Sequence, residues 1–170
     1  MKTLLSVLIL IGSPLLLAKG LGTPATPEEI AQWDLTVMTD GTGLPSGQGT
    51  AKEGEAVYNK HCQACHGPAG AGGTADELAG IAIELDMEYP EKTVGNYWPY
   101  ATTVFDLIRR SMPMPAPGSL NNNENYAVTA YLLYLNGIVE QDAIINSDTL
   151  PEVTMPNRDG FIDVYVEEKN

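Results

Sequence analysis

Positive charge is scarce in this sequence of 170 residues. Lysine and arginine together number 9, against 22 aspartates and glutamates, which gives a formal net charge of −13 at pH 7. Nucleic acids and anionic membrane surfaces are bound mainly through positive charge, so neither is an expected partner of this chain. The acidity favours an electropositive protein surface as the partner, or it serves solubility alone.

Long apolar runs are also scarce, and the clearest one lies at the N-terminus. Residues 1–20 combine a basic start, apolar residues over 4–17 and a small residue at Gly20, which is the order of a secretory signal peptide. Gly12 and Pro14 interrupt the run, which is shorter than the roughly 20 residues that cross a bilayer. We expect cleavage near Gly20 and a periplasmic protein without stable membrane insertion; an uncleaved anchor is the alternative.

Helix signals are separated by segments rich in turn residues. Thr26 and Glu29 predict a capped short helix, and Thr50 and Glu53 predict a capping box before a longer helix that ends after His66. Further helices are predicted over residues 76–83 (short at most), 101–110 and 121–137.

Cysteine and histidine are equally rare, because the chain has two of each, all within YNKHCQACHGPAG, residues 58–70. Helical spacing from Gly54 onward predicts that both cysteines lie on one side of a helix. Cysteines three positions apart on a helix can attach to the two vinyl groups of one haem, while the adjacent histidine binds the iron. The CxxCH motif of Cys62, Cys65 and His66 therefore predicts one covalently bound haem c.

Two other uses of this motif were possible. A thioredoxin-like dithiol would follow an apolar strand in a βαβ pattern, whereas a capped amphipathic helix precedes Cys62. A zinc site needs four ligands in a tetrahedron, and His61, Cys62, Cys65 and His66 lie too close together on one short peptide to form one. Both alternatives fit the residues less well than haem does.

A haem iron has a second axial position, and few side chains are available to fill it. His61 is tethered to the same side as Cys62 and cannot reach the opposite face, which leaves methionine. Met112 and Met114 lie in the loop SMPMPAPGSL, and Met112 comes directly after a predicted helix and before a proline. We predict His66 and Met112 as the iron ligands, with Met114 as the alternative.

The predicted ligand pair favours electron transfer over catalysis. Imidazole and thioether together stabilise ferrous iron and raise the reduction potential. With both axial positions filled, the chain has no place for peroxide or oxygen, and we expect no substrate site of its own. Two alternatives stay open: a haem enzyme that acts on thiosulfate or peroxide, and a free soluble electron carrier.

The order of these motifs resembles that of class I cytochromes c: a signal peptide, a helix with Gly54 and Tyr58, CxxCH, a Met-Pro loop and a final helix with Tyr131. The resemblance implies an all-α, class I cytochrome c fold around one covalent haem, with an irregular N-terminal arm and C-terminal tail. It also implies that the first and last helices cross each other. The residues at the crossing would be Gly54, Tyr58, Tyr131 and Tyr134. We expect a signal peptide over 1–20, an arm over 21–49, a cytochrome c domain over 50–138 and a C-terminal extension over 139–170.

A narrower resemblance covers nearly the whole chain after residue 20. The cytochrome subunit of bacterial sulfane/sulfite dehydrogenases is similar in the segments TPATPEEIAQWDLTVMTDGTGLPSGQG, TVGNYWPYATTVFDLIRRSMP, APGSL, AYLLYLNGIV and MPNRDGF. This resemblance implies a molybdenum-cofactor oxidoreductase subunit as electron donor and a small periplasmic cytochrome c as acceptor. It also assigns the axial role to Met112. Some members have a second haem domain, whereas this chain has a single CxxCH.

Other segments have expected contacts. The acidic stretch ELDMEYPE, residues 84–91, is the first expected docking site. Tyr97, Trp98, Tyr100 and Arg109 are expected to contact the haem edge or its propionates, or else to pack in the core. The N-terminal arm and the MPNRDGF tail either clasp a catalytic subunit or cover this domain.

Overall fold

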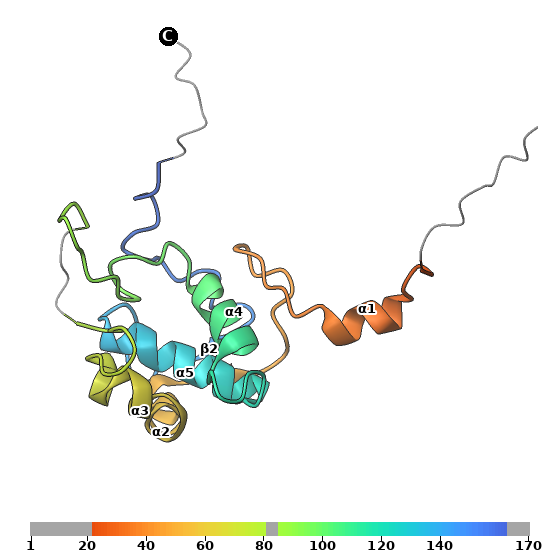
Figure 1. Cartoon of the computed structure of the whole chain (residues 1–170), viewed down its shortest axis with the longest axis horizontal. Coiled ribbons are helices and arrows are strands. Elements are labelled where there is room, and N and C mark those ends of the chain that lie inside the picture. The colour runs from red at the N-terminus through yellow and green to blue at the C-terminus, as the bar shows by residue number, and fades with distance from the viewer. Residues whose placement is uncertain (1–21, 81–84, 163–170) are drawn as a thin grey trace, which may run out of the picture. The chain divides into compact units, whose positions relative to one another are not determined.

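The computed structural model describes residues 22–80 and 85–162, so the predicted signal peptide lies outside the described residues. The chain divides into two units, Met1–Trp33 and Asp34–Asn170. None of the helices within the described ranges is long and apolar enough to cross a membrane. The elements, shown in Figure 1, are α1 (Pro27–Trp33) in the first unit, and β1 (Gln48–Gly49), α2 (Ala51–His61), α3 (Gln63–His66), the 3₁₀ helix η1 (Pro68–Gly70), α4 (Ala101–Ser111), α5 (Asn122–Leu135) and β2 (Ile145–Asn146) in the second.

Helix α1 forms where the capping signal predicts it. The Thr26 N–H donates to the Glu29 carboxylate (2.8 Å), and the Glu29 N–H donates to the Thr26 hydroxyl (3.2 Å). None of its residues is buried. Ile30 and Trp33, three positions apart and therefore on one side of the helix, are 51% and 84% exposed. The helix itself therefore leaves both apolar side chains exposed.

Helix α2 begins at the predicted capping box and ends before the first cysteine. The Glu53 N–H donates to the Thr50 hydroxyl (3.3 Å), and the Thr50 N–H donates to the Glu53 carboxylate (2.8 Å). The single helix predicted to run through His66 is interrupted at Cys62 (φ −118°, ψ −37°). The amides of Cys65 and His66 both donate to the Cys62 carbonyl, at 3.1 and 3.0 Å, so the chain turns more tightly there.

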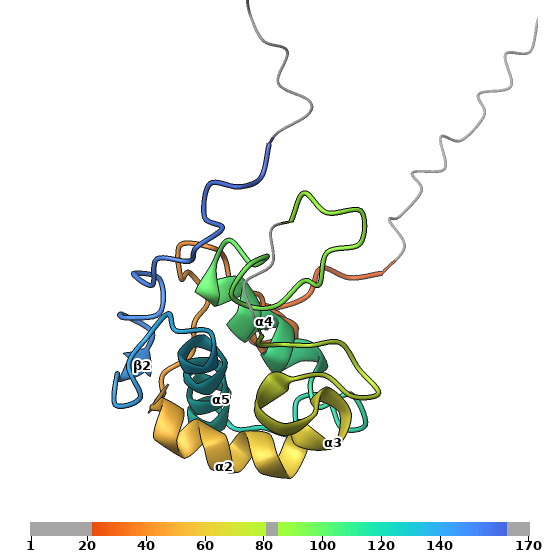
Figure 2. The same ribbon diagram turned by 90° about the vertical axis from the view of Figure 1, so that its left-hand side faces the viewer.

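Helices α2 and α5 cross, as Figure 2 shows, and their backbones approach closely at Gly54. A Cβ atom on Gly54 would lie 1.9 Å from the Ala127 carbonyl oxygen. Next to this point the rings of Tyr58 and Tyr131 lie 5.4 Å apart between centroids. The implied crossing contact is confirmed for these positions, but Tyr134 is 37% exposed. Tyr134 follows Ala127 by seven residues and Tyr131 by three, so it lies on the same side of α5, and its contact with α2 stays a prediction.

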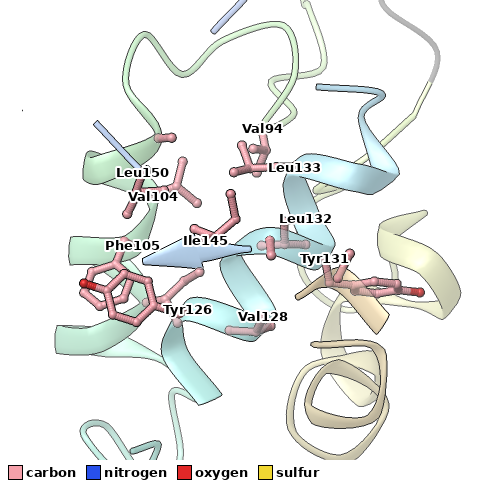
Figure 3. Packing of buried hydrophobic residues seen from close by; sticks show 14 of the residues in the cluster. Val94, Val104, Phe105, Tyr126, Val128, Tyr131, Leu132, Leu133, Ile145 and Leu150 are labelled. Carbon is pink, nitrogen blue, oxygen red and sulfur yellow. The ribbon is translucent and has the colours of Figure 1, made fainter. Parts of the chain in front are cut away.

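Aromatic packing between α4 and α5 forms the centre of the core. The rings of Phe105 and Tyr126 lie 4.5 Å apart between centroids, and both side chains are fully buried. Figure 3 shows them on the α4 side of α5, whereas Tyr131 points toward α2 and α3. Burial raises the pKa of Tyr126 to about 12, so its hydroxyl stays a hydrogen-bond donor at neutral pH. The predicted helices over 101–110 and 121–137 are confirmed and supply most of this core.

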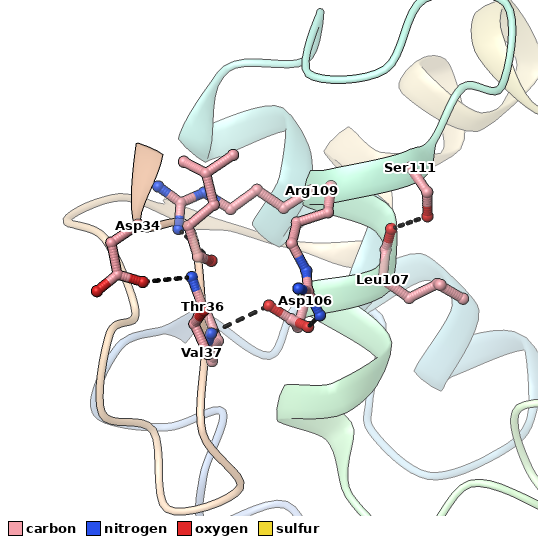
Figure 4. A network of polar contacts seen from close by, with 9 residues as sticks. Asp34, Thr36, Val37, Asp106, Leu107, Arg109 and Ser111 are labelled. Carbon is pink, nitrogen blue, oxygen red and sulfur yellow. Dashed lines mark hydrogen bonds and ion pairs between the residues drawn. The ribbon is translucent and has the colours of Figure 1, made fainter. Parts of the chain in front are cut away.

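The segment before α2 is held on α4 and α5 by bonds to its backbone (Figure 4). The Asp106 carboxylate accepts from the Val37 N–H (3.0 Å) and pairs with Arg110. Arg109, predicted near the haem edge or the core, donates to the Leu35 carbonyl at 3.2 Å. Three more side chains of these helices donate to backbone carbonyls of the segment: Thr102 to Thr39, Tyr126 to Pro45 and Asn122 to Ser46. These side chains supply partners that irregular backbone otherwise lacks, and they fix this part of the arm.

Residues 76–80, the described part of a predicted short helix, form no helix. Residues 76–83 were expected to form a short helix at most, and the part of them that the structure describes is not helical. The Leu78 N–H donates to the Gly70 carbonyl (2.8 Å), and the Leu78 carbonyl accepts from Val94 N–H and Asn136 Nδ2 (both 3.0 Å). Because these groups bond to distant parts of the chain, they are unavailable for helical bonds.

The C-terminal segment contributes to the core, whereas the sequence predicted an irregular surface tail. Strand β2 pairs with β1 in antiparallel orientation, with Ile145 opposite Gly49. Ile145, Leu150 and Met155 are only 3%, 0% and 1% exposed. They are five residues apart, which matches neither the helical nor the strand period, so no periodic pattern reveals them.

Candidate haem-binding site

Cys62 is the N-cap residue of α3 and Cys65 lies within that helix, and both are free, partly buried thiols. Cys62 also packs against the hydrophobic core. Burial, and to a smaller extent the neighbouring Cys65, raises the pKa of the Cys62 thiol to about 11. Redox-active dithiols have lowered thiol pKa values, so the site does not have the electrostatics of a thioredoxin-like dithiol.

His66 is the last residue of α3, and a backbone hydrogen bond orients its ring. Its Nδ1 lies 2.9 Å from the Asp76 carbonyl oxygen. A carbonyl only accepts, so Nδ1 carries the hydrogen and Nε2 keeps its lone pair. Metal-binding histidines almost always donate their other ring nitrogen in this way. The arrangement leaves the Nε2 lone pair available to bind a metal.

The backbone after His66 folds into a left-handed turn. The φ angle is +72° at Gly67, +51° at Ala69 and +76° at Gly70. A Cβ atom on Gly67 would lie 2.0 Å from the Gly72 carbonyl oxygen, so no side chain fits there. The Gly72 N–H in turn donates to the His66 carbonyl at 2.9 Å. The turn thus folds the following loop back onto the CxxCH motif.

Tyr58 reaches this turn from α2. Its side chain is fully buried, and its hydroxyl donates to the Gly67 carbonyl at 2.8 Å. Burial raises the pKa of Tyr58, and a hydrogen bond with the Gly70 backbone opposes that shift. The hydroxyl therefore stays protonated near neutral pH and remains a donor to the turn.

Met112 is the best placed of the methionines in the described residues. It caps the C-terminus of α4, and its N–H donates to the Ile108 carbonyl at 2.9 Å. Its side chain is partly buried against the same core cluster that Cys62 contacts. The exposed fractions of the other described methionines are 54% for Met38, 56% for Met87, 74% for Met114 and 1% for Met155. Partial burial beside the core favours Met112 over Met114 as the predicted axial ligand.

The C-terminal tail covers the aromatic residues that were expected at the haem edge or in the core. The Arg158 guanidinium lies over the Tyr100 ring, 4.3 Å from its centroid, and Asn157 Nδ2 donates to the Tyr97 carbonyl at 2.8 Å. Trp98 is partly buried against the core cluster. This part of the MPNRDGF tail therefore covers the domain itself.

The donor set fits haem and not a bare metal ion. Two free cysteines three positions apart directly precede a histidine whose Nε2 is available, and a partly buried methionine lies against the core that Cys62 also contacts. Within the described ranges, no group of three or more His, Cys, Asp and Glu could hold a metal ion. The zinc alternative therefore has no support in this part of the chain.

Comparison with known proteins agrees with the chemistry of the site. The chain belongs to the cytochrome c family, whose model, described as Cytochrome c, matches residues 51–136. A search of curated proteins found no significant match. Among solved structures, the chain is similar to a chain of the sulfane dehydrogenase SoxCD from Paracoccus pantotrophus, with 42% identity and a TM-score of 0.79 over 85% of this chain and 71% of that one.

Fold class and cofactor follow from this membership. The chain has the class I cytochrome c fold, mostly helical with little strand, and its cofactor is covalently bound haem c. Haem c supplies a one-electron redox centre, and the domain serves electron transfer.

Two contacts of the site were not found from the sequence. The partner of His66 is a backbone carbonyl, at Asp76, which no side-chain motif marks. Tyr58 was assigned to the helix crossing, which is correct for its ring, while its hydroxyl bond to Gly67 was missed. The sequence did hold a sign of this bond, because position 58, on the predicted buried side of the helix, is a tyrosine and not a phenylalanine. A buried tyrosine hydroxyl needs a hydrogen-bond partner.

Proposed function

We propose that Cys62 and Cys65 hold the haem through thioether bonds and that His66 and Met112 are its axial ligands. The observation that carries this proposal is the hydrogen bond of His66 Nδ1 to the Asp76 carbonyl, which leaves Nε2 free toward the metal. Met112 then occupies the second axial position, which leaves no open position for a substrate. The chain itself is therefore an electron carrier and not the site of bond-making chemistry.

We further propose that this cytochrome is the electron-accepting subunit of a periplasmic molybdenum-dependent sulfane or sulfite dehydrogenase. Similarity to a chain of SoxCD supports this role. Oxidation of the sulfur compound releases electron pairs in the catalytic subunit, and a single haem accepts one electron at a time and passes it to a small c-type cytochrome. Export depends on residues 1–20, which we propose are a cleaved signal peptide.

The purified exported protein should show one covalent haem and a filled sixth position. We expect its mass to exceed that of the bare chain by one haem, and its oxidised spectrum to carry the sulfur-to-iron charge-transfer band at the red end. The spectrum should not change when thiosulfate or peroxide is added. A high-spin spectrum that responds to either compound would contradict the carrier role and support a haem enzyme instead.

Helix α1 is the proposed anchor to the catalytic subunit. Ile30 and Trp33 form an exposed apolar pair, and the helix carries acidic but no basic residues. A helix of 7 residues is too short to be stable alone, since isolated helices need roughly 12–15 residues. The second unit, Asp34–Asn170, makes up 137 of 170 residues, or 81% of the chain. The similarity to SoxCD covers 85% of the chain, which is more than the second unit alone can supply, so it extends into the first unit. An apolar pocket with a basic rim on the catalytic subunit would complement this helix.

Replacing Trp33 by alanine should weaken binding to the catalytic subunit by roughly 30-fold, as expected for an aromatic anchor. The affinity of the purified cytochrome for the molybdenum subunit measures this, and reduction of the haem by dithionite checks that the haem site is intact. Tyr89→Ala is the matched control, because Tyr89 is 85% exposed, as Trp33 is at 84%, and lies in the acidic stretch over 84–91. Weaker binding by Tyr89→Ala alone would place the docking site in that stretch.

A further inference from the structure

We propose that the Tyr58 hydroxyl is a positioning group for the proximal histidine. The inference rests on the proposed role of His66 as an iron ligand. Tyr58 is fully buried, and its hydroxyl donates to the Gly67 carbonyl at 2.8 Å. Gly67 directly follows His66, so this bond ties α2 to the backbone on which the imidazole is mounted.

The turn that receives this bond needs external support. Ala69 lies in the left-handed region at φ +51°, where residues with a side chain rarely lie, between Gly67 and Gly70. The same loop continues to Asp76, whose carbonyl oxygen orients the His66 ring. If the turn relaxes, both the backbone and the ring partner of His66 shift together. A hydroxyl that holds Gly67 in place therefore acts on the orientation of the imidazole.

Packing and hydrogen bonding by Tyr58 can be separated. Its ring lies 5.4 Å from that of Tyr131 at the helix crossing. A phenylalanine would keep this ring contact and lose only the bond to Gly67. Tyr58→Phe therefore tests the hydroxyl without opening a cavity in the core.

Tyr126 offers a matched control away from the CxxCH motif. It is as fully buried as Tyr58, and its hydroxyl donates to a backbone carbonyl, that of Pro45, at the same distance of 2.8 Å. Tyr126→Phe thus removes an equivalent bond between a helix and irregular backbone. We expect both variants to lower the melting temperature of the haem-loaded protein by similar amounts.

Only Tyr58→Phe should change the haem. We expect it to shift the haem methyl resonances in the proton NMR spectrum of the oxidised protein. The midpoint potential of the haem should also shift. Amide exchange should become faster at Gly72, whose N–H donates to the His66 carbonyl. Tyr126→Phe should leave all three unchanged. Identical resonances and potentials in the two variants would overturn the inference. Absence of covalent haem from the wild type, visible in its mass, would instead overturn the proposed function on which it rests.

Discussion

Replacing Met112 by alanine is expected to lower the midpoint potential of the haem and to open its sixth coordination position. A thioether stabilises ferrous iron, and its replacement by water favours the ferric state. Axial ligands set haem potentials over roughly 0.8 V, so we expect a fall that is a sizeable part of that range. Redox titration measures the fall, and loss of the red charge-transfer band reports loss of the sulfur ligand. The opened position should also bind added small anions.

Met114→Ala is the control for this experiment. Met114 lies two residues further along the same loop and is 74% exposed, whereas Met112 is partly buried against the core. We expect Met114→Ala to leave the potential and the charge-transfer band unchanged. If Met114→Ala removes the band and Met112→Ala does not, the ligand assignment is wrong and the loop presents its other sulfur to the iron.

Replacing Gly54 by alanine should destabilise the fold by about 3 kcal/mol or more, as overpacking between rigid groups does. Helix propensity alone predicts the opposite, a gain of about 1 kcal/mol from glycine to alanine within a helix. The contact decides the sign, because the added Cβ would lie 1.9 Å from the Ala127 carbonyl oxygen, and backbone cannot rotate away as a side chain can. Helices α2 and α5 must therefore separate. Denaturant unfolding of the haem-loaded protein measures the loss.

Ala56→Gly is the matched control for Gly54→Ala. Ala56 is exposed on the same helix, so the change should cost only the propensity term of about 1 kcal/mol. The two variants make opposite substitutions, yet both should destabilise, and Gly54→Ala should destabilise more. A Gly54→Ala protein as stable as the wild type would show that the two helices do not touch at this point.

Local signals predicted the elements that carry the site. The predicted capping box at Thr50 is present, the last helix also has one at Asn121, and the three longer helices lie where periodicity and caps predict them. The CxxCH motif predicted haem chemistry because its spacing is dictated by the porphyrin itself. These features succeed because each depends on residues within a few positions of one another.

Features that depend on distant partners were not predictable from the sequence. The tail residues Ile145, Leu150 and Met155 are buried by pairing and packing with segments far along the chain, at a spacing without secondary-structure period. Around Leu78, where a short helix at most was predicted, the described residues are not helical, because the Leu78 backbone groups bond to Gly70, Val94 and Asn136. No local propensity encodes such contacts, which arise only when the helices are assembled.

Burial of the tail sets a limit on how this domain can be cut or joined to others. The family match ends at residue 136, yet Ile145, Leu150 and Met155 complete the core beyond it. A version trimmed at the family boundary would leave apolar cavities beside α4 and α5, each comparable to a large-to-small core substitution. Any arrangement that appends a second module to this cytochrome must therefore start its linker after these three side chains, or supply substitutes that fill the same space.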